Sequence, residues 1–187
     1  MVDKAVRPPK WSTTNGTPKS TFDVALTKKK QKEYLGKFKR SASALKWDEI
    51  HSDHFDWWMF PIDDGRLVEY NLTSETDIEI LRADPEWLAS YRESICIVAA
   101  AMGWDIQKMQ FIEPPHGSRW TDIRNHNKDV RLAKMIRSTW LLQVEDLFRS
   151  LQKFAHRINE ELYQGRGFYY GSINLDEILH MDLPRNG

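Results

Sequence analysis

Residues Val130–Leu162 read VRLAKMIRSTWLLQVEDLFRSLQKFAHRINEEL, with apolar side chains every three or four positions. This spacing places the apolar side chains on one face of a helix, which is typical of a helix packed on a core. The stretch is longer than an average helix, so we expect a break near Ser138-Thr139 and an end at Gly165 and Gly167. The apolar series is Val130, Ala133, Ile136, Leu141, Val144, Leu147, Phe148, Leu151, Phe154, Ala155, Ile158 and Leu162.

A second helix is predicted between Asp84 and Gly103. Asp84 suits the N-cap, Pro85 the first helical position, and Glu86 the positive end of the helix dipole. Gly103 is placed to end the helix, since glycine adopts the left-handed backbone that follows many helices. The apolar positions that mark its buried face are Leu88, Tyr91, Ile95, Val98 and Met102.

The remaining helical signals are shorter or weaker. Residues Phe22–Arg40 are compatible with a helix, Thr76-Asp77-Ile78-Glu79 resembles a capping box that opens a short helix through Ala83, and Leu175–His180 is a further candidate. Between 104 and 126 we expect a short extended piece before Pro114-Pro115, because a helix cannot run through these prolines. The sequence therefore predicts an all-α fold: a flexible or draped basic tail over 1–22, then a single helical domain over 23–187.

The composition argues against several kinds of site and of protein. Cys96 is the single cysteine, so neither an internal disulfide nor a cysteine-based zinc site is expected. The N-terminus lacks the pattern of a secretory signal, and no apolar stretch approaches the roughly 20 residues that cross a bilayer. We expect a soluble, intracellular, cytoplasmic protein without a membrane partner. The sequence indicates no particular oligomeric state.

Charge is distributed unevenly although the net charge is zero. Residues 1–46 hold 12 basic and 3 acidic residues, a net +9, and the remainder holds 15 and 24, a net −9. Such a basic arm is compatible with nucleic-acid binding. The interpretation we favour is that the arm lies over the acidic body or stays solvated, because its lysines are not interleaved with aromatic residues.

Three short motifs, in order, resemble the conserved region of the opioid growth factor receptor family. They are Trp58-Met59-Phe60-Pro61 with an aromatic residue and a histidine upstream, Leu72-Thr73 before a helix, and His126-Asn127 before the basic-aliphatic run 130–138. Together they span roughly residues 30–160, and the order of the motifs adds weight that each one lacks alone. The resemblance implies a helical domain and no particular reaction.

Two features favour a binding function. Adjacent residues of a helix point about 100° apart, so Trp57 and Trp58 can hardly face one interior, and we expect one of them to be partly exposed. A second cluster, dense in positive charge, is suited to clamp a carboxylate or phosphate. The sequence thus predicts a non-enzymatic interaction module for a peptide, protein or anionic ligand. The residues of the second cluster are His116, Arg119, Trp120, Arg124, His126, Asn127 and Arg131, although the His126-Asn127 pair also suits a helix cap.

An enzyme remains the alternative. His51, Asp53, His54 and Asp56 are of the types that bind zinc or iron, and His116, His126 or Glu113 would have to complete the site. We favour the interpretation that these polar residues solvate the back of an aromatic plug, and we expect no metal and no cofactor. A hydrolase acting on a phosphorylated or nucleotide-like substrate would require His54, His116 and His126 to converge.

Overall fold

The computed structural model describes residues 8–13, 22–65, 67–116, 123, 128–162, 169–170, 173–174 and 182. Within these residues the fold is all-α, as predicted. The α-helices are α1 (Val24–Ser43), α2 (Asp56–Met59), α3 (Glu75–Arg82), α4 (Pro85–Ala101), α5 (Lys128–Leu141) and α6 (Glu145–Leu162). Three 3-10 helices are η1 (Lys10–Thr13), η2 (Trp47–His51) and η3 (Val68–Tyr70), and the strands are β1 (Trp104–Asp105), β2 (Gln110–Phe111), β3 (Tyr169–Tyr170) and β4 (Ile173–Asn174).

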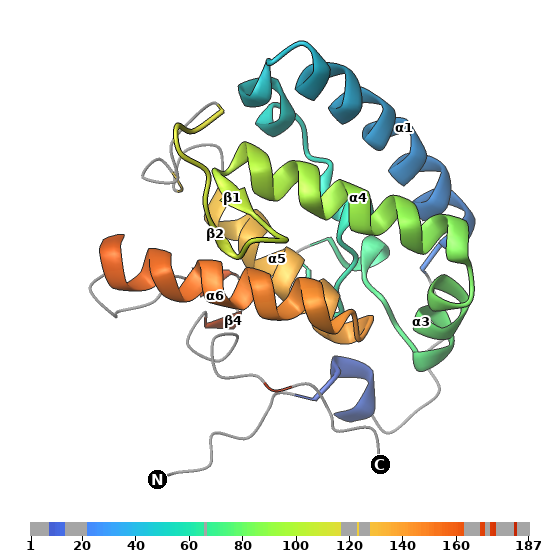
Figure 1. Cartoon of the computed structure of the whole chain (residues 1–187). Helices are drawn as coiled ribbons and strands as arrows, with labels where there is room; N and C mark the ends of the chain where they lie inside the picture. The colour runs from blue at the N-terminus through green and yellow to red at the C-terminus, as the bar shows by residue number, and fades with distance from the viewer. Residues whose placement is uncertain are drawn as a thin grey trace, which may run out of the picture.

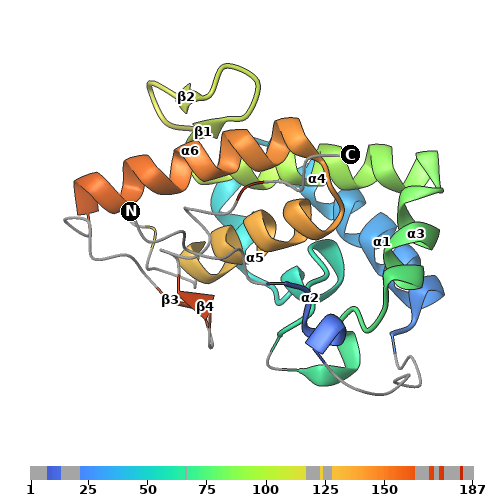
Figure 2. The same ribbon diagram turned by 90° about the horizontal axis from the view of Figure 1, so that it is seen from below.

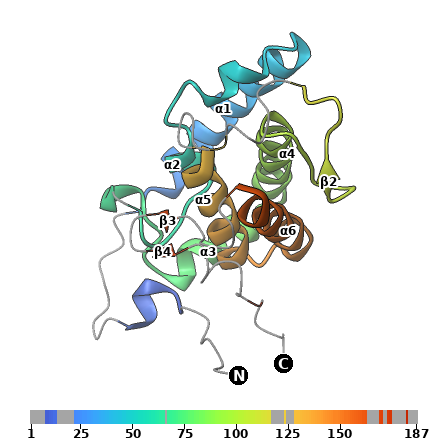
Figure 3. The same cartoon turned by 90° about the vertical axis from the view of Figure 1, so that its left-hand side faces the viewer.

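Helix α5 forms the centre of the molecule. It lies between α2 on one side and α6 on the other, an arrangement that is visible in both Figure 2 and Figure 3. Helix α4 crosses the front of the molecule with α1 packed along it and α3 leading into its start (Figure 1). Every residue from Arg131 to Leu142 is buried, so this stretch presents no face to solvent even though it contains charged and polar side chains.

Helices α3 and α4 begin with side-chain caps. The Asp84 carboxylate accepts a hydrogen bond from the Trp87 backbone N–H at 3.0 Å, and Pro85 occupies the first turn, as predicted. Gly103 follows the helix with φ 87°, which confirms the expected end. The prediction for α3 is two residues off, because its capping box is formed by Ser74 and Asp77.

The break between α5 and α6 lies at residues 142–144, so the prediction of a break at Ser138-Thr139 is wrong. Both hydroxyls have hydrogen-bond partners: Tyr91 of α4 donates to Ser138 Oγ at 2.9 Å, and Thr139 donates to the Met135 carbonyl of its own helix at 2.9 Å. Satisfied in this way, the two residues continue the helix. Gln143 instead adopts the left-handed backbone, with φ 54°.

The extended piece expected before the prolines is strand β2. It pairs with β1 in antiparallel register, with Trp104 opposite Phe111. The Trp104 ring stacks on Phe154 of α6 at 4.8 Å, and its indole N–H donates to Ser150 Oγ at 3.0 Å. This hairpin therefore closes one end of the α4–α6 interface. A second antiparallel pair joins β3 to β4.

Part of the predicted tail lies against the body. The Lys10 backbone N–H donates to Asp63 at 2.8 Å, and the Lys10 ammonium pairs with Asp64 at 2.7 Å. For Lys10 this corresponds to the draped form of the expectation, and the division into a tail over 1–22 and a domain over 23–187 stays a prediction. The helix expected over 175–180 lies outside the described residues. Among the helices that the structure does describe, none is long and apolar enough to cross a membrane.

Candidate functional site

Four cations are buried along the length of α5. Lys128, Arg131, Lys134 and Arg137 are three residues apart, and each is only 2% to 4% exposed. Two carboxylates contact this row from the segment that contains α2. The Lys134 ammonium lies 2.6 Å from Asp56, and Arg137 makes a two-point contact with Asp63 at 2.9 and 2.5 Å. We call these four residues the buried basic row.

Arg131 was predicted to bind a ligand, and its position is that of a structural residue. Its guanidinium donates to the carbonyls of His51 at 3.0 Å and Asp53 at 2.7 Å, and it covers the Phe55 ring at 4.6 Å. Burial lowers the pKa of Arg131, although the Asp56 carboxylate 3.6 Å from Nε acts in the opposite direction. Arg131 therefore holds the loop before α2 onto α5.

His51 and Asp56 do not solvate the back of an aromatic plug, because both are buried. His51 Nδ1 lies 3.4 Å from Arg131 Nη1, and a guanidinium can only donate, so this nitrogen must accept. Burial, with Arg131 and Lys128 nearby, lowers the pKa of His51 to about 3. The imidazole is therefore neutral at pH 7 and serves packing.

The two adjacent tryptophans belong to a larger aromatic surface. Trp57 stacks between His54, at 5.1 Å and 7°, and Tyr70, at 5.6 Å and 9°. Trp58 stacks on Tyr34 of α1 at 5.9 Å. Both tryptophans are partly exposed, whereas the sequence predicted partial exposure of only one of them. We call the five residues Tyr34, His54, Trp57, Trp58 and Tyr70 the aromatic band.

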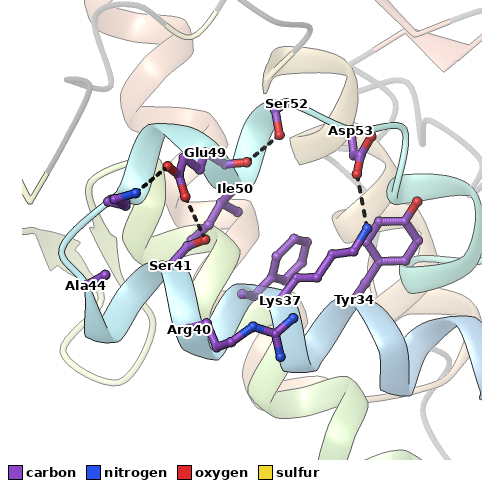
Figure 4. A pocket seen from close by; sticks show the side chains of 11 residues that line it. Tyr34, Lys37, Arg40, Ser41, Ala44, Glu49, Ile50, Ser52 and Asp53 are labelled. Atoms are coloured by element: carbon purple, nitrogen blue, oxygen red, sulfur yellow. Dashed lines mark hydrogen bonds and ion pairs between the residues drawn. The ribbon is translucent and has the colours of Figure 1, made fainter.

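A groove of about 430 Å³ adjoins the aromatic band at Tyr34. Figure 4 shows it between the C-terminal half of α1 and the segment that carries η2. Its floor contains buried Phe38 and Ile50, and its walls carry charged and polar side chains. The lining residues are Tyr34, Lys37, Phe38, Arg40, Ser41, Ala44, Lys46, Glu49, Ile50, Ser52 and Asp53.

The carboxylates of the groove are already engaged. Lys37 reaches Asp53 at 3.4 Å, and Glu49 is contacted by Lys46 at 3.1 Å and by the Ser41 hydroxyl at 3.2 Å. Arg40 differs, because no carboxylate of the described residues lies within ion-pair distance of it and its side chain is exposed. In Figure 4 no interaction is drawn to Arg40. Among the described residues, Arg40 is thus a groove cation that has no ion-pair partner.

The basic face of α1 turned toward α4 is largely neutralised. Lys28 pairs with Asp84 at 2.6 Å and Lys39 with Glu93 at 2.7 Å, both across the α1–α4 contact. A longer contact of 4.0 Å joins Lys32 to Glu86. These contacts agree with the interpretation in which the basic segment covers acidic parts of the body.

The predicted histidines do not share a ring contact. His54 stacks on Trp57, and His116 stacks on Trp47 at 4.9 Å. In the described part of the chain, no three His, Cys, Asp or Glu residues are placed to hold a metal ion. The other predicted site residues, Arg119, Trp120, Arg124, His126 and Asn127, lie outside the described residues.

The groove was not predicted from the sequence. Its residues come from α1 and from the loop and helix that follow, which the sequence shows only as a sparse apolar stripe and a polar linker. One signal was available. Leu45 is the only large apolar residue in the stretch RSASAL (40–45), which ends α1, and it follows directly after the groove residue Ala44.

Comparison with known proteins adds no neighbour: no family model, curated protein or solved structure matches the chain. The resemblance to the opioid growth factor receptor family stays a prediction.

Proposed function

We propose that this protein is a non-enzymatic interaction module that binds a short segment of a partner protein. The observation that supports this most is the continuity of the aromatic band with the groove through Tyr34. Tryptophan, tyrosine and arginine are enriched among the residues that dominate protein–protein binding energy. Here Trp57, Trp58 and Tyr34 are partly exposed, and Tyr34 lines the groove together with Arg40.

The size and shape of the groove support a peptide segment. A volume of about 430 Å³ lies in the range of pockets that enclose small ligands or a few side chains. The groove has an apolar floor and charged walls, an arrangement that combines buried contact area with orienting polar groups. Resemblance to the opioid growth factor receptor family is part of this proposal, as the source of the expected helical scaffold.

The alternatives have less support. A hydrolase would need His54 and His116 near one another, yet these rings stack on different tryptophans. Non-specific nucleic-acid binding would use aromatic faces for stacking, and the Trp57 ring already stacks on His54 and on Tyr70. Lys28 and Lys39 are in addition paired with carboxylates of α4 or its cap.

The test is a selection of random 12-residue peptides displayed on phage against the full chain. Enriched peptides are then synthesised with a fluorescent label, and their dissociation constants are measured by fluorescence anisotropy. Tyr34→Ala should weaken binding about tenfold or more, the loss typical of a central aromatic contact. Phe111→Ala is the control, since Phe111 is a partly buried aromatic residue on β2, away from α1 in Figure 1.

Thermal melts must show that both variants fold before the dissociation constants are compared. If no peptide is enriched, or if Tyr34→Ala and Phe111→Ala weaken binding equally, the proposed function is wrong. Equal binding by wild type and Tyr34→Ala would place the interaction elsewhere on the molecule.

A further inference from the structure

Leu45 is next to the groove in the chain, although it is not itself one of the residues that line it. It is 76% exposed, the largest exposed fraction among the large apolar residues that the structure describes. It lies between Ala44 and Lys46, both of which line the groove. Scattered single apolar residues are common on protein surfaces, so exposure alone carries no argument. The backbone of Leu45 supplies the second observation.

Leu45 adopts a left-handed backbone, with φ 58°. Its N–H donates to the Ala42 carbonyl at 3.0 Å, and the next N–H, of Lys46, donates to the Ser41 carbonyl at 2.8 Å. These two bonds define a Schellman motif that ends α1, with Leu45 in the position normally taken by glycine. Helix α4 has Gly103 in the same position, with φ 87°. A side chain at Leu45 therefore costs stability and, being exposed, recovers little by packing.

The charges of the groove complement an acidic ligand. Lys37, Arg40 and Lys46 stand against Glu49 and Asp53, and these two carboxylates already have intramolecular partners. The exposed guanidinium of Arg40 is suited to two-point recognition of a carboxylate. The groove thus presents an exposed cation, Arg40, and the residue that follows its lining residue Ala44 is an exposed apolar side chain; contacts among the described residues explain neither.

From this arrangement we infer that the partner segment is acidic and apolar: one of its carboxylates pairs with Arg40, and one of its aliphatic side chains packs on Leu45. The inference rests on the proposed function, since it names the chemistry of the peptide bound in the same groove. Sequences that alternate glutamate with leucine carry this chemistry in its simplest form.

The experiment uses three labelled peptides and the full chain. The first is Gly-Glu-Leu-Glu-Leu-Glu-Gly, the second has glutamine for each glutamate, and the third has serine for each leucine. In fluorescence anisotropy the first should bind at least tenfold more tightly than the other two. Arg40→Ala should abolish the preference for glutamate over glutamine, while the preference for leucine over serine persists. Leu45→Gly should abolish the preference for leucine over serine and keep the preference for glutamate over glutamine. Together the two variants assign each preference to one side chain.

Two matched controls accompany these variants. Lys29→Ala removes an exposed cation of α1 that does not line the groove, and should leave both preferences intact. Gln143→Gly places glycine at the end of α5, where Gln143 also has a left-handed backbone, with φ 54°, in a Schellman motif. Leu45→Gly should raise Tm by about 2–4 °C. Gln143→Gly should raise it less, because Gln143 also accepts an exposed hydrogen bond from Arg82.

The outcomes separate the inference from the proposed function. If the glutamine peptide binds as tightly as the glutamate peptide, or if Leu45→Gly lowers Tm and keeps the leucine preference, the inference is overturned. Peptides from the library that bind in a Tyr34-dependent way without carboxylates would overturn the inference and leave the proposed function standing. Tighter, Arg40-dependent binding of a labelled single-stranded oligothymidine would overturn it in favour of a phosphate ligand.

Discussion

Helices α1 and α5 both carry rows of lysine and arginine, but the row on α1 faces solvent and the row on α5 is buried. On α5 the four cations of the buried basic row are at most 4% exposed, and Asp56 and Asp63 contact three of them. On α1 the cations make scattered pairs with partly or largely exposed carboxylates, such as the Lys39–Glu93 pair. Lysine and arginine therefore hold packed segments together on α5 and form exposed ion pairs on α1.

The difference follows from solvation. A buried charge loses its hydration and must be paired and hydrogen-bonded, so the partners of the buried basic row are held in one geometry. An exposed charge keeps its hydration, and its pairing contributes little. Exposed cations can consequently exchange an intramolecular partner for a ligand, whereas buried ones cannot. By this contrast, Arg40 is the residue that can bind a ligand, and Arg131 is a structural residue.

The largest expected loss of stability comes from removing the negative charge of Asp63, which pairs with Arg137 of the buried basic row. Asp63→Asn keeps the shape of the side chain and leaves Arg137 without its ion-pair partner, so we expect a loss of about 3–5 kcal/mol in the free energy of unfolding. Urea denaturation followed by circular dichroism measures it. Asp53→Asn, which affects only the exposed pair with Lys37, should cost less than about 1 kcal/mol.

A double substitution sharpens the same point. Asp63→Leu combined with Arg137→Met removes both charges, and apolar replacement of a whole buried pair is often tolerated. We expect the double variant to be more stable than Asp63→Asn in the same urea experiment. If the double variant is instead the less stable of the two, the Asp63–Arg137 ion pair itself stabilises the fold, and the cost of Asp63→Asn does not come only from leaving Arg137 unpaired.

The next effect is a dependence on pH through His51. Its pKa is about 3 in the folded chain, against about 6.5 for an unfolded histidine, so the unfolded state binds more protons between these values. The contribution of His51 to the free energy of unfolding is therefore fully present above about pH 6.5 and decreases as the pH falls toward 3. At pH 5 this residue alone lowers the free energy of unfolding by about 2 kcal/mol.

The measurement is urea denaturation at pH 7 and pH 5. His51→Phe should reduce the difference between the two values by about 2 kcal/mol, because it removes the group that titrates. His54→Gln is the matched control, since this histidine is exposed, and it should keep the wild-type difference. An unchanged pH dependence in His51→Phe would contradict the assignment of a neutral, buried imidazole.

The smallest expected effect is on the exposed row. Lys39→Ala removes a pair whose two side chains are about half exposed, so the loss should be below about 1 kcal/mol. It should shrink further when urea denaturation is repeated at 0.5 M NaCl in place of 0.05 M, because salt screens exposed charges. An effect of Lys39→Ala that is large and independent of salt would remove the contrast between the two helices.

Much of the scaffold could be predicted from local patterns. Asp84, Pro85 and Gly103 act through bonds and dihedral angles within a few residues, so their roles in α4 are visible in the sequence. The break after α5 was misplaced because Ser138 and Thr139 are satisfied by partners, one of which, Tyr91, is distant in sequence. A hydroxyl in a helix looks the same in sequence whether or not such a partner exists.

The candidate site was less accessible to prediction. One of Trp57 and Trp58 was expected to be partly exposed, because two adjacent residues of a helix can hardly face one interior, and the structure leaves both partly exposed. Arg131 was assigned to binding from the positive charge around it, and the burial of its guanidinium depends on a loop about 80 residues earlier in the chain. Residue type alone does not distinguish a cation that holds a loop from one that meets a ligand.

The sequence by itself determined the all-α class, the start and end of α4, and the partial exposure of at least one of Trp57 and Trp58, because these depend on periodicity, capping and side-chain direction over a few residues. Only the tertiary structure decided which basic residues are buried and where the groove lies. Both depend on solvation, and the solvation of a charge is set by the segments that pack around it, which come from distant parts of the chain.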